Sequence, residues 1–381
     1  MNDRIRSALA LCLISVLMLS VISCGNKTDV LALPSKEVDY LNKTGNVLNG
    51  KELDLEIIGA VDLVVCDSLL VVTTNNPNGL IQVLRLSDLQ PLASFGTKGR
   101  TRNEFNWEPC NYTRQYYYRN GDIIMPFYDN ASDVLKEVNI SESIRQGRTV
   151  TEGIMDCQSM LGLGMDNVAL DNDFGHRFMV NAVWSDEQNN IAVRFCSSNR
   201  NDTTEIPVFN EKLESPVDNL SSIAVVIGIL HKNPERNRIV YPLQYLDYIF
   251  VFDADTGEHF AIHQKESSNI ATALKNSDLE LNTLTFYGSA AVTPDFFLIL
   301  YQGGDYSKTG GKTEEQKQEL LAFDWDGNYL GGVKLGSDVR SIAYDQSHNM
   351  LYGLNTVYET FYSFDLTEFT KSFAKASLLT E

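Results

Sequence analysis

The sequence predicts an all-β protein built from repeated sheets, and three observations support this. Short apolar runs rich in β-branched residues recur along the chain, and each is bounded by Asp, Asn, Gly or Pro, as strands between tight turns are. Groups of several runs repeat about every 50 residues, a period typical of β-propeller blades. Helical periodicity is scarce. Chain length divided by this period gives about six or seven blades, each of which buries its faces against its neighbours.

The first 23 residues form a predicted signal peptide. Arg4 and Arg6 precede an uncharged apolar stretch at 8–22, shorter than the roughly 20 residues that a membrane-spanning helix requires. Ser23 and Cys24 follow, and a small residue before a cysteine resembles the lipobox of bacterial lipoproteins. An ordinary secretory signal or a membrane anchor is the alternative. We expect Cys24 to carry the lipid anchor, since several acyl chains bind a membrane firmly where one binds reversibly.

Four segments are expected along the chain: the signal peptide at 1–23, a lipidated tether at 24–48, the propeller at 49–372 and a C-terminal tail at 373–381. Residues 25–50 are polar with scattered apolar positions, which is typical of a tether, whereas strand-like runs begin near Leu53. A short helix is expected within Ser267–Leu284, and Gly303–Lys317 is expected to be a loop insertion.

The predicted strands share β-branched or aromatic content and flanking turn residues. They lie at 61–65, 69–73, 81–86, 121–128, 134–140, 178–184, 191–195, 205–209, 239–245, 248–252, 259–263, 296–301, 320–324, 329–335, 339–344, 350–354 and 361–364.

One short motif repeats: segments 251–257 (VFDADTG) and 322–327 (AFDWDG) match closely, and 363–366 (SFDL) is a weaker third copy. Each copy predicts an apolar strand that ends in Asp, a tight turn and a returning strand. The acids at 253 and 255, and those at 171 and 173, also resemble the start of a calcium loop. The twelfth positions hold Gln264 and Ala182 instead of a bidentate acid, so hairpin turns are expected.

The segment Phe95-Gly96-Thr97-Lys98-Gly99, followed by Glu104-Phe105 and Pro109, resembles the junction between NHL-type propeller blades. With the lipobox and the FDWDG turn, the sequence is similar to the TolB-like six-bladed propeller lipoproteins of diderm bacteria over about residues 45–370. The resemblance implies six blades rather than seven. It implies no established activity. The stretch 100–103 (RTRN) departs from the family's usual Gly- and Pro-rich loop.

Charge and motifs restrict the function. The net charge of −19 opposes binding to nucleic acid and to anionic membrane surfaces, so the lipid must provide the tether. No acidic retention residue follows Cys24, which favours the outer membrane, facing the periplasm or the cell surface. Neither a Gly-x-Ser-x-Gly motif nor a phosphate-binding loop is present. His259 and His263 would lie about 13 Å apart on a strand, too far to share one ion. No metal and no cofactor is therefore expected.

Four further cysteines are present: Cys66, Cys110, Cys157 and Cys196. Their spacings match no metal-ligand pattern. An exported protein permits disulfides, so either buried free thiols or one or two bridges fit the sequence, which does not select a pairing.

Basic and aromatic residues cluster in one region and form the candidate binding site: Lys98, Arg100, Arg102, Trp107, Tyr112 and Arg114. Tyr116, Tyr117 and Tyr118 follow. Arg and aromatic side chains are enriched where proteins bind partners. The alternative is that Tyr116 and Tyr118 pack between blades and that the charges are solvated.

These observations favour a binding module that holds a peptide, a protein partner or a glycan at one face of the ring, where loops from several blades meet. A lyase or hydrolase site in the channel mouth is the alternative function, and a purely structural envelope component is a third. A deep pocket with two or more buried charged side chains would favour the enzyme, whereas a broad aromatic face would favour binding. Fold alone does not decide between them.

Overall fold

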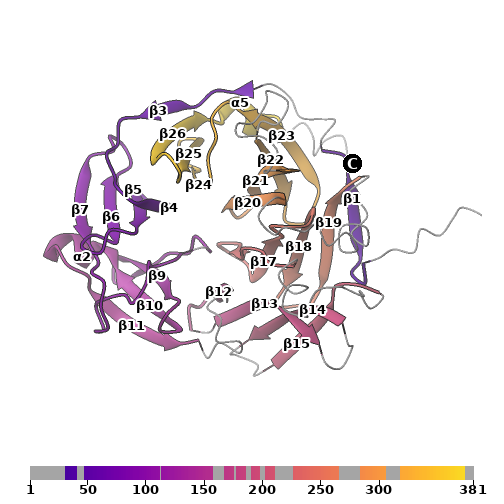
Figure 1. Cartoon of the computed structure of the whole chain (residues 1–381), viewed down its shortest axis with the longest axis horizontal. Coiled ribbons are helices and arrows are strands. Elements are labelled where there is room, and N and C mark those ends of the chain that lie inside the picture. The colour runs from indigo at the N-terminus through magenta and orange to yellow at the C-terminus, as the bar shows by residue number, and fades with distance from the viewer. Residues whose placement is uncertain are drawn as a thin grey trace, which may run out of the picture.

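The chain folds as a ring of β-sheets around a central channel, so the predicted all-β propeller is confirmed (Figure 1). The computed structural model describes residues 31–40, 47–111, 113–157, 167–175, 177–185, 190–197, 202–210, 226–265, 284–305 and 318–373. The predicted signal peptide, Cys24 and the helix expected within Ser267–Leu284 lie outside these residues, apart from Leu284 itself.

The described strands pair into six sheets of four or five strands, in which strands adjacent along the chain pair antiparallel. The first three sheets, from the channel outward, are β4–β7 (Ala60–Cys66, Leu69–Thr74, Ile81–Arg85, Pro91–Phe95), β8–β11 (Tyr117–Arg119, Asp122–Asp129, Val134–Asn139, Thr151–Asp156) and β12–β15 (Asn167–Leu170, Arg177–Ser185, Asn190–Ser197, Asp202–Pro207). The next three are β16–β19 (His231–Lys232, Arg238–Pro242, Tyr248–Asp253, His259–Gln264), β20–β23 (Leu284–Val292, Phe296–Asp305, Glu319–Asp324, Tyr329–Leu335) and β24–β26 (Ser341–Asp345, Met350–Asn355, Thr360–Asp365).

The core lies between the sheets. Each pair of neighbouring sheets encloses one apolar cluster, and the ring closes where Leu354 and Phe361 of the last sheet pack with Leu70 and Val72 of the first. A β-sheet that is apolar on both faces is stable only when both are covered. The packing of one sheet against the next therefore explains why the sequence repeats a unit that would not fold alone.

The N-terminal segment is part of the propeller, which corrects the expected tether at 24–48. β1 (Ser35–Val38) pairs parallel with β19, and β2 (Val47–Leu48) pairs parallel with β23. β3 (Lys51–Leu53) pairs antiparallel with β26 and supplies the fourth strand of the last sheet. Outermost strands offer unpaired backbone donors and acceptors, and a polar segment can pair with them without an apolar pattern of its own.

A buried polar network fixes this segment. The Tyr40 hydroxyl donates to the Asp247 carboxylate and lies 2.6 Å from the Tyr287 hydroxyl, which donates to the same carboxylate at 2.6 Å. Burial raises the pKa of Asp247, and burial also raises the pKa of both tyrosines. The network joins the N-terminal segment to two neighbouring sheets.

Most predicted strands are present, with differences at three places. The strand predicted to end at residue 140 gives way to α2 (Ile140–Gln146), because the Asn139 side chain accepts from the Glu142 amide at 2.7 Å and caps the helix. The third copy of the turn motif leads into α5 (Thr367–Lys371) instead of a returning strand, because β3 already occupies that edge. Phe373, the first residue of the expected tail, packs against Phe296.

The two close copies of the turn motif are hairpin turns, as predicted. The Asp253 carboxylate accepts from the amides of Asp255 and Thr256, and Asp324 accepts from those of Asp326 and Asn328. Gly257 and Gly327 close the two turns with φ of +79° and +81°, a conformation that favours glycine.

All four cysteines are free thiols in the structure, and burial raises the pKa of the Cys66 thiol. Within the described residues, no three His, Cys, Asp or Glu side chains lie close enough together to hold a metal ion.

None of the helices in the described part of the chain is both long and apolar enough to span a membrane.

Candidate functional site

The innermost strands of the ring wall the channel and create two cavities, one at each end. Early residues of β4, β20 and β24 (Asp62, Ser289 and Ser341) line one cavity, and later residues of the same strands (Val65, Val292 and Asp345) line the other. These strands therefore run in the same direction along the channel, and each contributes different side chains to its two ends.

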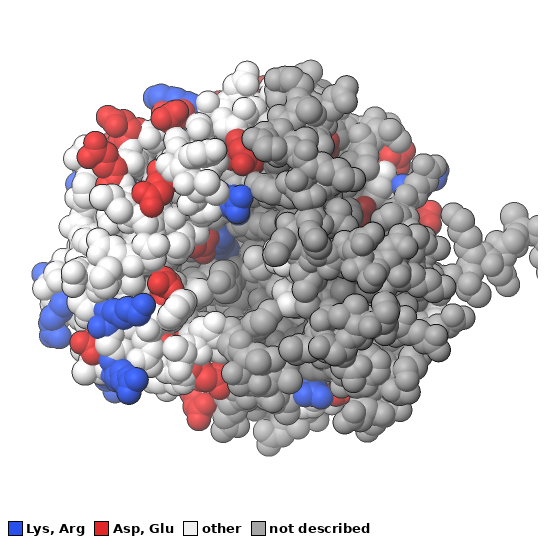
Figure 2. All heavy atoms as spheres, in the orientation of Figure 1, with Lys and Arg blue, Asp and Glu red and all other residues white. Residues whose placement is uncertain are grey.

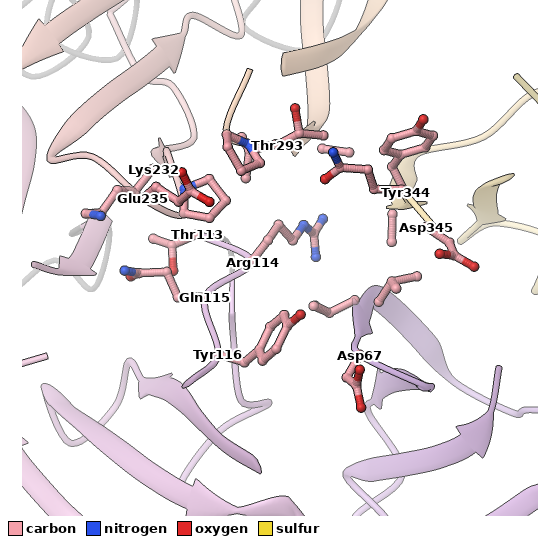
Figure 3. A pocket seen from close by; sticks show the side chains of 18 of the residues that line it. Asp67, Thr113, Arg114, Gln115, Tyr116, Lys232, Glu235, Thr293, Tyr344 and Asp345 are labelled. Carbon is pink, nitrogen blue, oxygen red and sulfur yellow. The ribbon is translucent and has the colours of Figure 1, made fainter. Parts of the chain in front are cut away.

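The cavity at the end of these strands is named the acidic mouth and has a volume of about 650 Å³. Three carboxylates line it, from Asp67, Glu235 and Asp345. The tyrosines of the lining are Tyr116, Tyr118 and Tyr344. Its position at the ends of the innermost strands means that short loops from several sheets converge there, as in many ligand sites (Figure 3).

Arg114 forms the floor of the acidic mouth. It lies on the connection between β7 and β8, and Figure 3 shows its guanidinium at the centre of the site. It donates to Asp62 at 2.5 Å, to the Leu63 carbonyl at 2.8 Å and to Ser289 at 2.9 Å. Ser341 also donates to Asp62. One side chain thus joins three sheets across the channel and separates the two cavities.

One wall of the acidic mouth is a pair of tyrosines. The rings of Tyr116 and Tyr118 meet edge to face, with centroids 6.2 Å apart. Tyr118 is 57% exposed, and burial together with the neighbouring Asp67 raises its pKa to about 12. These tyrosines stay protonated at neutral pH and present both a ring and a hydroxyl to the cavity. The alternative that they only pack between sheets is therefore wrong for Tyr118.

A buried lysine forms the opposite wall. Lys232 at the end of β16 is enclosed, and its ammonium donates to the Asn172 side chain, to the Asn233 carbonyl at 2.9 Å and to the Arg236 carbonyl at 3.0 Å. Burial lowers its pKa to about 8, which the nearby Asp171 partly opposes. Three acceptors for three ammonium hydrogens indicate that Lys232 organises the loop beside Glu235.

The cavity at the start of the innermost strands is named the basic mouth and has a volume of about 490 Å³. Its charged lining residues are Asp62, Arg114 and Arg340, two guanidinium groups against one carboxylate. Thr73, Gln244, Tyr245 and Gln302 contribute further polar groups. Because Asp62 already pairs with Arg114, the remaining charge of this mouth is positive.

The predicted binding cluster is divided by the structure. Arg114 lies in the channel, whereas Lys98, Arg100, Arg102 and Trp107 lie on the loop that follows β7. Trp107 is 53% exposed with the Lys98 ammonium 4.6 Å from its ring, and Lys98 and Arg100 line a shallow depression. Figure 2 shows basic side chains at this edge of the ring, near α2 and β11 of Figure 1.

Arg102 of this edge group donates to the backbone carbonyls of Thr151 and Glu152 on β11, so it joins two sheets. Tyr112 lies outside the described residues. Sequence reasoning missed Lys232, Glu235 and Asp345, because each stands in a turn with no neighbouring motif. The ends of the innermost strands are the signal that could have located them, once strand order was known.

No protein-family model matches the chain. No curated protein matches it either. The resemblance to TolB-like propellers therefore stays a prediction.

Several solved structures share the fold. The chain is similar to a candidate exported protein of Bacteroides fragilis, with a TM-score of 0.49 and 10% identity over 87% of this chain and 98% of that one. It is also similar to the Pan2 WD40 domain of Neurospora crassa, with a TM-score of 0.39 and 11% identity over 81% and 78% of the two chains. A third is hydrazine synthase of Kuenenia stuttgartiensis, with a TM-score of 0.42 and 9% identity over 83% and 97%. These likenesses assign no activity to the chain.

Proposed function

We propose that this protein is an exported, lipid-anchored six-bladed propeller that binds a basic segment of a partner protein at its acidic mouth. Six sheets and six clusters between them support the blade number. The observation that carries the binding function is the cavity of about 650 Å³ in which tyrosine rings and carboxylates lie together.

The chemistry of this cavity suits a lysine or arginine side chain. Aromatic faces attract cations, and the attraction strengthens where water is excluded. Asp67 and Glu235 add carboxylates on opposite sides of the mouth. The positive charges at the site are already engaged, since Arg114 pairs with Asp62 and Lys232 donates to three acceptors. The negative charge thus remains to attract a partner.

Site-specific photo-crosslinking in intact cells tests this proposal. A photoreactive phenylalanine analogue replaces Tyr118 in the acidic mouth or, as the control, Ile154, an exposed apolar residue on the outermost strand β11. We expect a discrete crosslinked protein from position 118 and none from position 154. Crosslinks of equal yield from both positions, or none from 118, would contradict a partner site in the acidic mouth.

The lipid anchor is proposed at Cys24, in the outer membrane. It rests on the uncharged stretch that precedes Ser23 and Cys24. Cells fed an alkyne-labelled fatty acid should label the wild-type protein and not a Cys24→Ser variant. Equal labelling of both proteins would remove the anchor from the proposal and leave an exported propeller.

An enzyme at the same mouth is the second candidate, and one observation favours it: Arg114 and Lys232 are buried charged side chains that face the cavity. A lysine with a pKa of about 8 could also act as a base or nucleophile. A limiting amount of a lysine-reactive ester tests this, with quantification by peptide mapping. Preferential labelling of Lys232 over exposed Lys371 would support an enzyme, whereas an unlabelled Lys232 fits its three acceptors and the binding function.

A further inference from the structure

The basic mouth contains buried polar atoms that the fold does not use. Thr73 is 2% exposed, and within the described part of the chain its hydroxyl has no hydrogen-bond partner. The Arg114 side chain is 8% exposed, and its Nε–H also lacks a partner among the described residues, although both Nη groups are engaged. A buried polar group without a partner costs roughly 1–3 kcal/mol, so such groups in a native protein indicate a role.

The two atoms belong to one place. Thr73 on β5 lies directly opposite Asp62 on β4, and Asp62 holds the Arg114 guanidinium at 2.5 Å. Thr73 and Arg114 both line the cavity of about 490 Å³. That volume falls within the range of small-molecule sites, roughly 300–1,000 Å³. Two unused donors therefore face a cavity large enough for a ligand.

From this arrangement we propose that the basic mouth binds a small monocarboxylate whose remaining atoms carry hydroxyl or amide groups. The carboxylate accepts from Arg114 Nε and the Thr73 hydroxyl, and Arg340 on the same rim supplies the positive charge. A single charge is favoured over a phosphate dianion, because Asp62 neutralises Arg114 and leaves one net cation. Gln244, Tyr245 and Gln302 provide partners for the polar remainder.

The site is separate from the acidic mouth, so its failure and that of the proposed partner function are distinguishable. Isothermal titration calorimetry on the purified lipoprotein in detergent uses lactate, gluconate, glucuronate and glutamine as probes. Glucose serves as the uncharged match of glucuronate, and inorganic phosphate as the divalent comparison. We expect at least one monocarboxylate to bind more tightly than glucose and phosphate.

Three variants locate the binding. Thr73→Val removes a hydroxyl without a partner, so it should leave the melting temperature unchanged or higher while weakening the carboxylate roughly fivefold to tenfold. Arg340→Gln should weaken it roughly tenfold or more, since hydrogen bonds to charged groups are stronger. Lys98→Gln, on the distant edge of the ring, should change nothing.

Binding of none of the four monocarboxylates would overturn the proposal. So would equal affinity for glucuronate and glucose, tighter binding of phosphate, or an unchanged affinity in Thr73→Val. Because Thr73→Val preserves the fold on physical grounds, a loss of binding in that variant cannot be ascribed to unfolding.

Discussion

The two mouths of the channel are walled by the same innermost strands, yet their chemistry is opposite. The acidic mouth combines carboxylates with tyrosine rings, whereas the basic mouth combines two guanidinium groups with neutral polar side chains. Arg114 lines both and separates them. The comparison teaches that a propeller strand of a few residues can serve two sites, because its beginning and its end face different solvent volumes.

Arg114 makes the comparison possible, and its removal should have the largest effect. Arg114→Met leaves the Asp62 carboxylate buried without its cation, and breaking such a pair costs about 3–5 kcal/mol of unfolding free energy. Urea denaturation measures this loss. Arg85→Met removes an exposed ion pair to Asp88 and is the matched control, with an expected cost below about 1 kcal/mol.

Equal costs in the two variants would mean that Arg114 does not hold the sheets together. A double variant, Arg114→Met with Asp62→Leu, sharpens the result, because it removes both charges. It should unfold less readily than Arg114→Met alone.

Lys232 tests whether the acidic mouth is held by a buried ammonium. Its pKa of about 8 in the folded chain lies below the value of roughly 10.4 expected when it is unfolded. Between these two pH values the unfolded chain binds more protons, so the contribution of Lys232 to the unfolding free energy rises with pH.

Lys232→Met should abolish that rise. At neutral pH it should also cost about 1–3 kcal/mol, since three buried acceptors lose their donor. Urea denaturation from pH 7.5 to 10.5 measures both effects, with Lys371→Met on the exposed α5 as the control. The same pH slope in Lys232→Met and in the wild type would show that Lys232 is not responsible.

The smallest effect is expected at the edge of the ring. Arg100→Ala, Arg102→Ala and Trp107→Ala together should lower the melting temperature by only a few degrees, because these side chains are largely exposed. Thermal unfolding checks the stability, and crosslinking from position 118 checks the binding. If crosslinking disappears while the melting temperature holds, the edge of the ring is the recognition surface and the acidic mouth is not.

Much of the fold could be predicted from the sequence because strand signals are local. The alternation of β-branched residues and the turns at Asp253 and Asp324 are set by neighbours a few positions away. The pairing of β1 with β19 could not be predicted, since Ser35–Val38 is polar and its partner lies more than 220 residues away. Only the closed ring brings these two segments together.

The site was less predictable for the same reason. Arg114 looks like Arg100 and Arg102 in sequence, and only its 2.5 Å contact with Asp62, on another sheet, distinguishes a buried ion from exposed ones. Lys232 and Glu235 stand in a turn whose sequence shows nothing unusual. Their role depends on where the ring places that turn, at the end of an innermost strand.

The most direct test of the account is crosslinking from position 118 in a chain whose acidic mouth has changed sign. Glu235→Lys replaces a carboxylate of the lining with an ammonium at an exposed position, so the fold should be retained. The account predicts that the crosslinked yield falls at least tenfold, and that high salt weakens the wild-type yield in the same direction. An unchanged or higher yield in Glu235→Lys would contradict binding of a basic segment at the acidic mouth.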